Sequence, residues 1–321
     1  MTIITNYLNN LLGFDGGLVF PMSRYNIAPM DWMQLVVETT QEKADLLSEV
    51  LMGLGSVSVT FSDTNDDAIY EPPVGQTPLW QTTTIHALFE LEVDQPHIKS
   101  TLSTLCGVKN VVFERLEDRI WEDECKKDFH AMGFGNRLWI CPSWEDQSQL
   151  PGNAVVIDMD PGLAFGTGTH QTTDLCLQYL DENPPVNQAV IDYGSGTGVL
   201  AIAAAKLGAQ SVVAIDNDPQ AVLATIGNVE TNDVVDIINV VHSDDEGELE
   251  QVDMLIANIL ANPLVELASH LANLVKPNGK IVLSGILDEQ LDMVLKAYGQ
   301  HFNDLAVKKK DDWCLVDGIR R

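Results

Sequence analysis

Positive charge is scarce in this sequence, and that scarcity limits the partners it can have. Lysine and arginine number 18 against 47 aspartates and glutamates, which gives a formal net charge of −29. Such a charge repels phosphate backbones, so free nucleic acid is excluded as the main partner and a basic protein is favoured. A source whose proteins are generally acidic explains the same number, and both explanations stay open.

The sequence also lacks the marks of membrane, secreted and metal-binding chains. Apolar-leaning stretches such as residues 199–207 fall well short of the roughly 20 residues that cross a bilayer, and residues 1–20 lack the cationic and apolar regions of a secretion signal. Five cysteines are scattered without a Cys-x-x-Cys pair, the pattern of reduced thiols rather than of a zinc site. We expect a cytoplasmic protein with no membrane partner and no metal.

A chain of 321 residues that is 45% hydrophobic is long enough for about two domains. Residues 1–30 show no sustained period and are expected to form an N-terminal extension, untranslated or disordered. Met30 stands directly before the first clear strand. We therefore hypothesise that translation begins at Met30, which the intact mass of the protein from its source would test.

Residues 31–117 alternate between strand and helix periods in the order βαββαβ, which predicts a ferredoxin-like α+β domain. The polar, proline-containing loop 62–81 between its middle strands is suited to recognition. The expected strands are 33–38, 56–61, 83–91 and 110–116, and the expected helices are 42–54 and 95–105.

Residues 118–135 are charged and carry a sparse apolar stripe, which predicts a linker helix. Residues 136–321 then alternate strands with helices, the pattern of a parallel, doubly wound α/β sheet. A hairpin of residues 304–309 and 312–320 is expected at its C-terminal edge. The other expected strands are 186–192, 211–216, 237–241, 254–257 and 280–283, and the expected helices are 199–207, 219–228, 263–275 and 288–297.

A glycine-rich loop follows the strand that ends at Asp192. Gly194, Gly196 and Gly198 allow a sharp turn and the close approach of a ligand to the backbone. The dinucleotide fingerprint G-x-G-x-x-G is not met, because the third glycine comes one residue early. Asp216 ends the next strand, where an acidic side chain accepts hydrogen bonds from ribose hydroxyls. Loop and acid together predict a nucleoside cofactor.

Two further segments carry polar groups at the carboxyl edge of the predicted sheet. Asn258 follows a buried strand, and its carboxamide can accept a hydrogen bond from an attacking amine and orient it, unless it only caps the next helix. The segment 160–173 is too rich in glycine and threonine for a core element and is predicted to bind the cofactor, with Phe165 on its base or sulfonium. His170 is expected to give hydrogen-bonded support, with general-base catalysis as the less favoured role.

The motifs DPGLAFGTGTHQTT (160–173), DYGSGTGVLAIAA (192–204), ANILANPL (257–264) and SGIL (284–287), in this order behind a ferredoxin-like domain, resemble the PrmA family. Members of that family methylate large-subunit ribosomal protein eleven, on its α-amine and on lysine ε-amines. The resemblance covers residues 31–321 and implies a Rossmann-like class I methyltransferase sheet. It also implies that the N-terminal domain grips the ribosomal protein.

By that resemblance the cofactor is S-adenosyl-L-methionine, and Asn258 is both a catalytic and a cofactor-binding residue. The other implied cofactor-binding residues are Thr173, Gly194, Asp216, Phe165, Thr169 and Gly196. Ser195 stands where the family often has cysteine, Gln171 where it has proline and Cys125 where it has an aromatic residue, but none of these removes a proposed contact.

Other functions remain open from the sequence alone. They are a methyltransferase that acts on another protein or on a small-molecule amine, an NAD-dependent oxidoreductase, and a non-catalytic ribosome-associated binding module.

Overall fold

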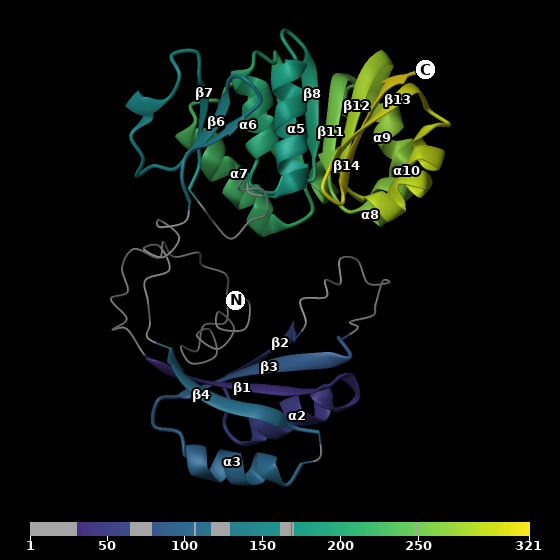
Figure 1. The fold of residues 1–321 in the computed structure, drawn as a ribbon. Coiled ribbons are helices and arrows are strands. Elements are labelled where there is room, and N and C mark those ends of the chain that lie inside the picture. Colours follow the sequence, from purple (N-terminus) through teal and green to yellow (C-terminus); the bar gives the residue numbers. More distant parts are fainter. Residues whose placement is uncertain are drawn as a thin grey trace. The chain divides into compact units, whose positions relative to one another are not determined.

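The computed structural model describes residues 31–64, 79–105, 107–116, 129–160, 168, 170–247 and 249–321. The chain divides into two compact units, Met1–Trp121 and Glu122–Arg321, each built around its own sheet (Figure 1). Within the described residues, no helix is long and apolar enough to cross a membrane.

The first unit has the ferredoxin-like order that the sequence predicted. Its antiparallel sheet runs β2-β3-β1-β4, and both helices cover one face (Figure 1). Side chains alternate along β1 and β3, so Leu35, Val37, Ile85 and Phe89 are fully buried under the helices. The elements are β1 (Trp32–Thr40), α2 (Gln41–Gly53), β2 (Ser58–Asp63), β3 (Thr82–Glu90), α3 (Gln95–Ser103) and β4 (Lys109–Leu116).

The predicted linker helix is wrong where the structure describes it. Residues 118–128 of that prediction lie outside the described residues, but residues 129–131 are not helical and Met132–Phe134 form strand β5. This strand pairs with β6 (Leu138–Cys141), which pairs in turn with β7 (Val155–Asp158). Burial of Phe134 and of β6 residues in the core of the second unit explains the difference, because this contact is long-range and carries no helical period.

The main sheet of the second unit is the Rossmann-like sheet that we expected, in the order β10-β9-β8-β11-β12-β14-β13. Helices α5, α6 and α7 pack on one face, and α8, α9 and α10 pack on the other. Its strands are β8 (Ala189–Tyr193), β9 (Ser211–Asp216), β10 (Ile238–His242), β11 (Val252–Asn258), β12 (Val275–Leu287), β13 (Phe302–Lys310) and β14 (Trp313–Arg320).

The four expected helices of this unit are present, with one difference. The expected helix 263–275 is two helices, α8 and α9, which meet at Leu267. Helix α7 begins as predicted at Pro219, and its N-cap Asp218 accepts a hydrogen bond from the backbone N–H of Gln220. The helices are α5 (Gln171–Glu182), α6 (Val199–Lys206), α7 (Pro219–Thr231), α8 (Ala261–Glu266), α9 (Ala268–Leu274) and α10 (Leu291–Tyr298), with short 3-10 turns at Gln147–Gln149, Ser243–Asp245 and Asp288–Gln290.

The direction of one strand distinguishes this sheet from that of the dinucleotide-binding fold. Strands β10, β9, β8, β11 and β12 are parallel, and β14 lies antiparallel between β12 and the edge strand β13. The predicted C-terminal hairpin is therefore confirmed. The usual dinucleotide fold has no antiparallel strand inserted at this place. Three described cysteines, Cys141, Cys176 and Cys314, are buried and not in disulfides.

Candidate cofactor and amine site

The glycine-rich loop leaves β8 in a conformation that only glycine adopts without strain. Gly194 and Gly198 have φ angles of +82° and +79°. A Cβ atom at Gly194 would lie 2.2 Å from Cγ2 of Ile259. The loop and the segment after β11 are therefore in direct contact, which brings together two of the predicted motifs.

Asp216 holds the loop from the end of β9. One carboxylate oxygen accepts the backbone N–H of Gly196 at 2.8 Å, and the other accepts that of Asp218 at 2.9 Å. A carboxylate offers about four acceptor positions, so each oxygen keeps capacity for a ribose hydroxyl. The residues present therefore fit a nucleoside cofactor.

Asp192, directly before the loop, is a buried carboxyl whose role the sequence did not reveal. Its Oδ2 accepts the backbone N–H of Ala201 at 2.9 Å, and Oδ1 has no hydrogen-bond partner among the described residues. Burial, with the charge of Asp216 adding to it, raises the pKa of Asp192 to about 7 although the bond from Ala201 lowers it.

Asn258 is the last residue of β11, and only one of the two polar atoms of its carboxamide is hydrogen-bonded within the described residues. Its Nδ2 donates to Oγ1 of the buried Thr173 at 3.4 Å, while Oδ1 is buried and has no partner among the described residues. An orphaned buried acceptor costs free energy unless a ligand donates to it. The carboxamide is therefore suited to accept a hydrogen bond from an amine or from the cofactor.

Of the two backbone carbonyls after Asn258, that of Leu260 is engaged elsewhere. The carbonyl of Leu260 accepts the N–H of Leu264 in the first turn of α8. The carbonyl oxygen of Ile259 lies 2.2 Å from where a Cβ of Gly285 would stand, and Gly285 has a φ of +84°. The close packing of Gly285 against Ile259 thus fixes the backbone that carries Asn258.

His170 has the role that we favoured for it, hydrogen-bonded support of the local backbone. It is the N-cap residue of α5, where its Nδ1 accepts the backbone N–H of Thr172 at 3.3 Å. Its ring meets Trp313 edge to face at 4.9 Å between centroids. Burial lowers the pKa of His170, which keeps the ring neutral near pH 7.

Of the predicted site residues, the structure groups Thr173, Gly194, Gly196, Asp216 and Asn258 through these contacts. Phe165 and Thr169 lie outside the described residues. Sequence reasoning missed Thr225 and Asn228, which bind the loop, and gave no role to Gly285 of the SGIL motif, which touches the segment after β11. Their signal was present, since Thr225 and Asn228 are polar residues three apart on an otherwise amphipathic helix.

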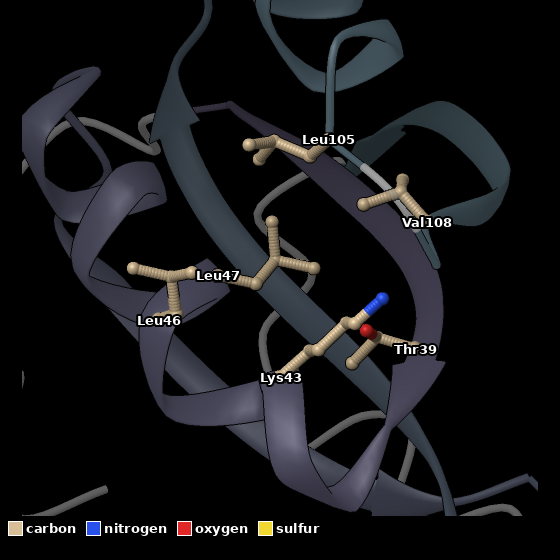
Figure 2. A pocket seen from close by; sticks show the side chains of 6 residues that line it. All are labelled: Thr39, Lys43, Leu46, Leu47, Leu105 and Val108. Carbon is tan, nitrogen blue, oxygen red and sulfur yellow. The ribbon is translucent and has the colours of Figure 1, made fainter.

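A pocket of about 210 Å³ lies in the first unit, between α2 and the segment before β4 (Figure 2). Its lining is apolar except for Thr39 and Lys43. None of the residues predicted for the cofactor lines it, so it is not part of the site described above.

Comparison with known proteins decides the family. The family model described as "Ribosomal protein L11 methyltransferase (PrmA)" matches residues 31–321. This chain belongs to the PrmA family. The resemblance seen in the sequence motifs is thereby confirmed.

Individual relatives agree with this assignment. A ribosomal protein L11 methyltransferase of Haemophilus influenzae (strain PittEE) is 47% identical over 292 residues, which are 90% of this chain and 98% of that protein. One of Actinobacillus pleuropneumoniae serotype 3 (strain JL03) is 45% identical over 298 residues, 91% of this chain and 100% of that protein. The crystal structure of a ribosomal protein L11 methylase from Lactobacillus delbrueckii subsp. bulgaricus is 30% identical, with a TM-score of 0.55 over 60% of this chain and 98% of that one.

Membership of the PrmA family fixes the cofactor and the class of reaction. The chain is a methyltransferase that uses S-adenosylmethionine, as the sequence predicted. The glycine cradle, the acceptor capacity of Asp216 and the orphaned Asn258 Oδ1 are compatible with such a cofactor.

Proposed function

We propose that this protein methylates ribosomal protein L11 in the cytoplasm, at the α-amine and at lysine ε-amines. The names of its relatives support L11 as the substrate. The amine chemistry is supported by one observation on Asn258, which lies next to the glycine-rich loop. Its Oδ1 is buried and has no hydrogen-bond partner among the described residues.

We propose that Thr173, Gly194, Gly196, Asp216 and Asn258 form the cofactor site, with Phe165 and Thr169 completing it. Asp216 supports this proposal because its carboxylate keeps acceptor capacity after binding two backbone N–H groups. When bound, S-adenosylmethionine supplies an electrophilic methyl group on a sulfonium.

Asn258 orients the amine that receives this methyl. Transfer between sulfur and nitrogen is an in-line displacement, so catalysis depends mainly on position and exclusion of water. Oδ1 of Asn258 accepts one N–H of the neutral amine and directs its lone pair. A neutral acceptor serves better than a carboxylate, which would stabilise the unreactive ammonium.

The two kinds of amine place different demands on this site. An α-amine with a pKa of about 7.7–8.0 is partly neutral at cytosolic pH. The pKa of a lysine, about 10.4, lies roughly 3 units above that pH, so deprotonating its ε-amine costs about 4 kcal/mol. The enzyme therefore methylates the α-amine with less dependence on pH than it does lysine.

Methyl-labelled S-adenosylmethionine and purified ribosomal proteins test this function. We expect label on L11, and peptide mass spectrometry should place it on both the N-terminal residue and lysines. Label on another ribosomal protein instead would refute the substrate, and label confined to one kind of amine would refute the dual specificity. Mock incubation with the Asp216→Ala variant is the control for a contaminating enzyme.

A further inference from the structure

Helix α7 carries a polar stripe on the side that faces the rest of the second unit. Thr225, Asn228 and Asn232, its C-cap, are spaced so that they share one face of the helix. Thr225 is fully buried and Asn232 is 5% exposed. Polar side chains at such depth destabilise a fold unless they are hydrogen-bonded, and the bonds they make lead to two different segments.

The first two residues of the stripe hold the glycine-rich loop. The hydroxyl of Thr225 donates to the carbonyl of Gly196 at 3.0 Å, and Nδ2 of Asn228 donates to the carbonyl of Thr197 at 2.8 Å. Asp216 binds the N–H of the same Gly196. The backbone N–H of Gly196 is therefore bound by a residue of β9, and its carbonyl by a residue of α7.

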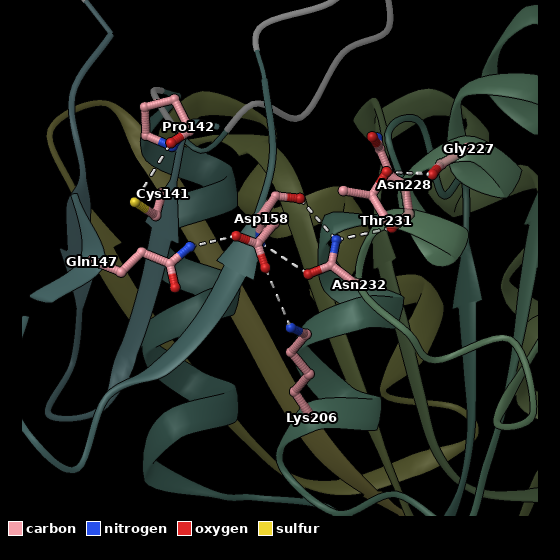
Figure 3. A network of polar contacts seen from close by, with 9 residues as sticks. All are labelled: Cys141, Pro142, Gln147, Asp158, Lys206, Gly227, Asn228, Thr231 and Asn232. Atoms are coloured by element: carbon pink, nitrogen blue, oxygen red, sulfur yellow. Dashed lines mark hydrogen bonds and ion pairs between the residues drawn. The ribbon is translucent and has the colours of Figure 1, made fainter. Parts of the chain in front are cut away.

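Asn232 holds a different segment, the end of β7. Its Oδ1 accepts the N–H of Asp158 at 2.9 Å and its Nδ2 donates to the carbonyl of Asp158 at 2.8 Å (Figure 3). A residue of an antiparallel strand makes this pair of bonds with its neighbour. The single carboxamide thus takes the place of a strand beside the edge of the three-stranded sheet.

A continuous chain of bonds joins the two segments. Nδ2 of Asn232 also donates to the carbonyl of Asn228 at 2.8 Å, and Asn228 binds the loop through its own side chain. The side chain of Asp158 is secured by Gln147 at 2.5 Å and faces Lys206 at 3.9 Å (Figure 3). Helix capping explains only the bond to Asn228, because the two bonds to Asp158 leave the helix.

We propose that Asn232 is a positioning residue for cofactor binding, which fixes β7 to the helix that fixes the glycine-rich loop. The motif 160–173 follows β7 directly in the sequence, and Thr173 at its end contacts Asn258. Asn232 therefore sets the spacing between the end of β7 and the glycine-rich loop, and acts on cofactor binding through that spacing. This inference rests on the cofactor site proposed above.

Three substitutions separate positioning from stability. Asn232→Ala removes the bonds to Asp158, and Asn232→Asp keeps the size of the side chain but replaces its donor with a second acceptor. Val234→Ala, at a buried position of the same core, is the control for lost stability. We expect both Asn232 variants to raise the Kd for S-adenosylmethionine by about tenfold, the order expected for a lost buried hydrogen bond.

Isothermal titration at a temperature where all variants are folded gives these affinities. The control is expected to bind within about twofold of the parent protein, because its hydrogen bonds are intact. Equal affinities of Asn232→Ala and Val234→Ala would overturn the proposal, and so would parent-like binding by Asn232→Asp.

Hydrogen exchange without cofactor tests the coupling directly and does not depend on the function. In Asn232→Ala we expect faster exchange at residues 155–158 and also at residues 194–198, which Asn232 does not touch. Faster exchange at 155–158 alone would overturn the coupling. If the parent protein binds no S-adenosylmethionine but Asn232→Ala still exchanges faster in both segments, the cofactor site proposed above fails while the coupling between β7 and the loop stands.

Discussion

At the residue scale, the carboxamide of Asn258 can be separated from cofactor binding by kinetics. Removing it in Asn258→Ala leaves the cradle of glycines and Asp216 in place but takes away the acceptor that orients the amine. We expect kcat to fall by roughly 100-fold, far more than the affinity for S-adenosylmethionine, which loses one of several contacts in its site. Single-turnover methylation and titration measure the two. Equal losses in both would contradict the orienting role.

Asn258→Asp is the matched variant, with a side chain of the same size and a negative charge. The carboxylate stabilises the ammonium form of the substrate amine. Its turnover should therefore be low near neutral pH and recover partly as the pH rises. A variant with parent-like turnover at neutral pH would show that neutrality of the acceptor is not required.

The buried carboxyl of Asp192 makes the stability of the protein depend on pH. Its native pKa of about 7 lies above the ordinary value of 3.8, so the native state binds more protons than the unfolded chain between these values. Stability is then lost as the pH rises through this window and levels off above it. Asp192→Asn removes this loss, and its advantage over the parent should grow by up to about 4 kcal/mol between about pH 4 and pH 8.

Denaturant unfolding of both proteins at several pH values measures the difference. Asp236→Asn, at an exposed position, is the control and should run parallel to the parent. An Asp192→Asn curve that also runs parallel to the parent would show that the carboxyl is not titrating on folding.

At the element scale, the contact between the β11–α8 segment and β12 leaves no room for a side chain at Gly285. A Cβ there would lie 2.2 Å from the carbonyl oxygen of Ile259, and the φ of +84° is itself strained for other residues. We expect Gly285→Ala to destabilise the fold by about 2 kcal/mol or more. It should also weaken methyl transfer, because Asn258 must move with Ile259.

Gly227→Ala is the control for this substitution. Gly227 lies in α7 with nothing within 4 Å of its would-be Cβ, so alanine should stabilise the helix by roughly 0.5–1 kcal/mol. Thermal unfolding and a methylation assay of both variants check this. Parent-like activity in a folded Gly285→Ala protein would show that the segment adjusts without disturbing Asn258.

Elements with a clear period were predictable from the sequence, and short ones were not. Buried and half-buried side chains alternate from Gln34 to Thr39 in β1 and from Thr82 to Phe89 in β3, so these strands have a period of two. Strands β5 and β6 have only three and four residues and carry no period. The break between α8 and α9 could not be predicted either, because the residue at the break is Leu267 rather than a glycine or a proline.

The site shows the same division. Gly194, Asp216 and Asn258 could be proposed from the sequence because each stands at the end of a predicted strand, at one edge of the sheet, where ligands bind. The role of Asn232 was not predictable, because its partner Asp158 is 74 residues away and only the folded structure brings the two together.

At the scale of the whole molecule, a net charge of −29 favours approach of a basic protein. Salt screens this attraction, because the net charges act on each other over distances longer than the Debye length, which is about 8 Å at physiological ionic strength. The KM for the protein substrate should therefore rise several-fold between about 50 and 500 mM salt.

Binding of S-adenosylmethionine provides the internal control, because its contacts lie within one site and its own net charge is small. Its Kd should change by less than about twofold over the same range. If both constants rise together, salt acts on the enzyme rather than on the encounter. If neither rises, the acidic surface plays no part in recognising the substrate, and its charge reflects the general acidity of proteins in its source.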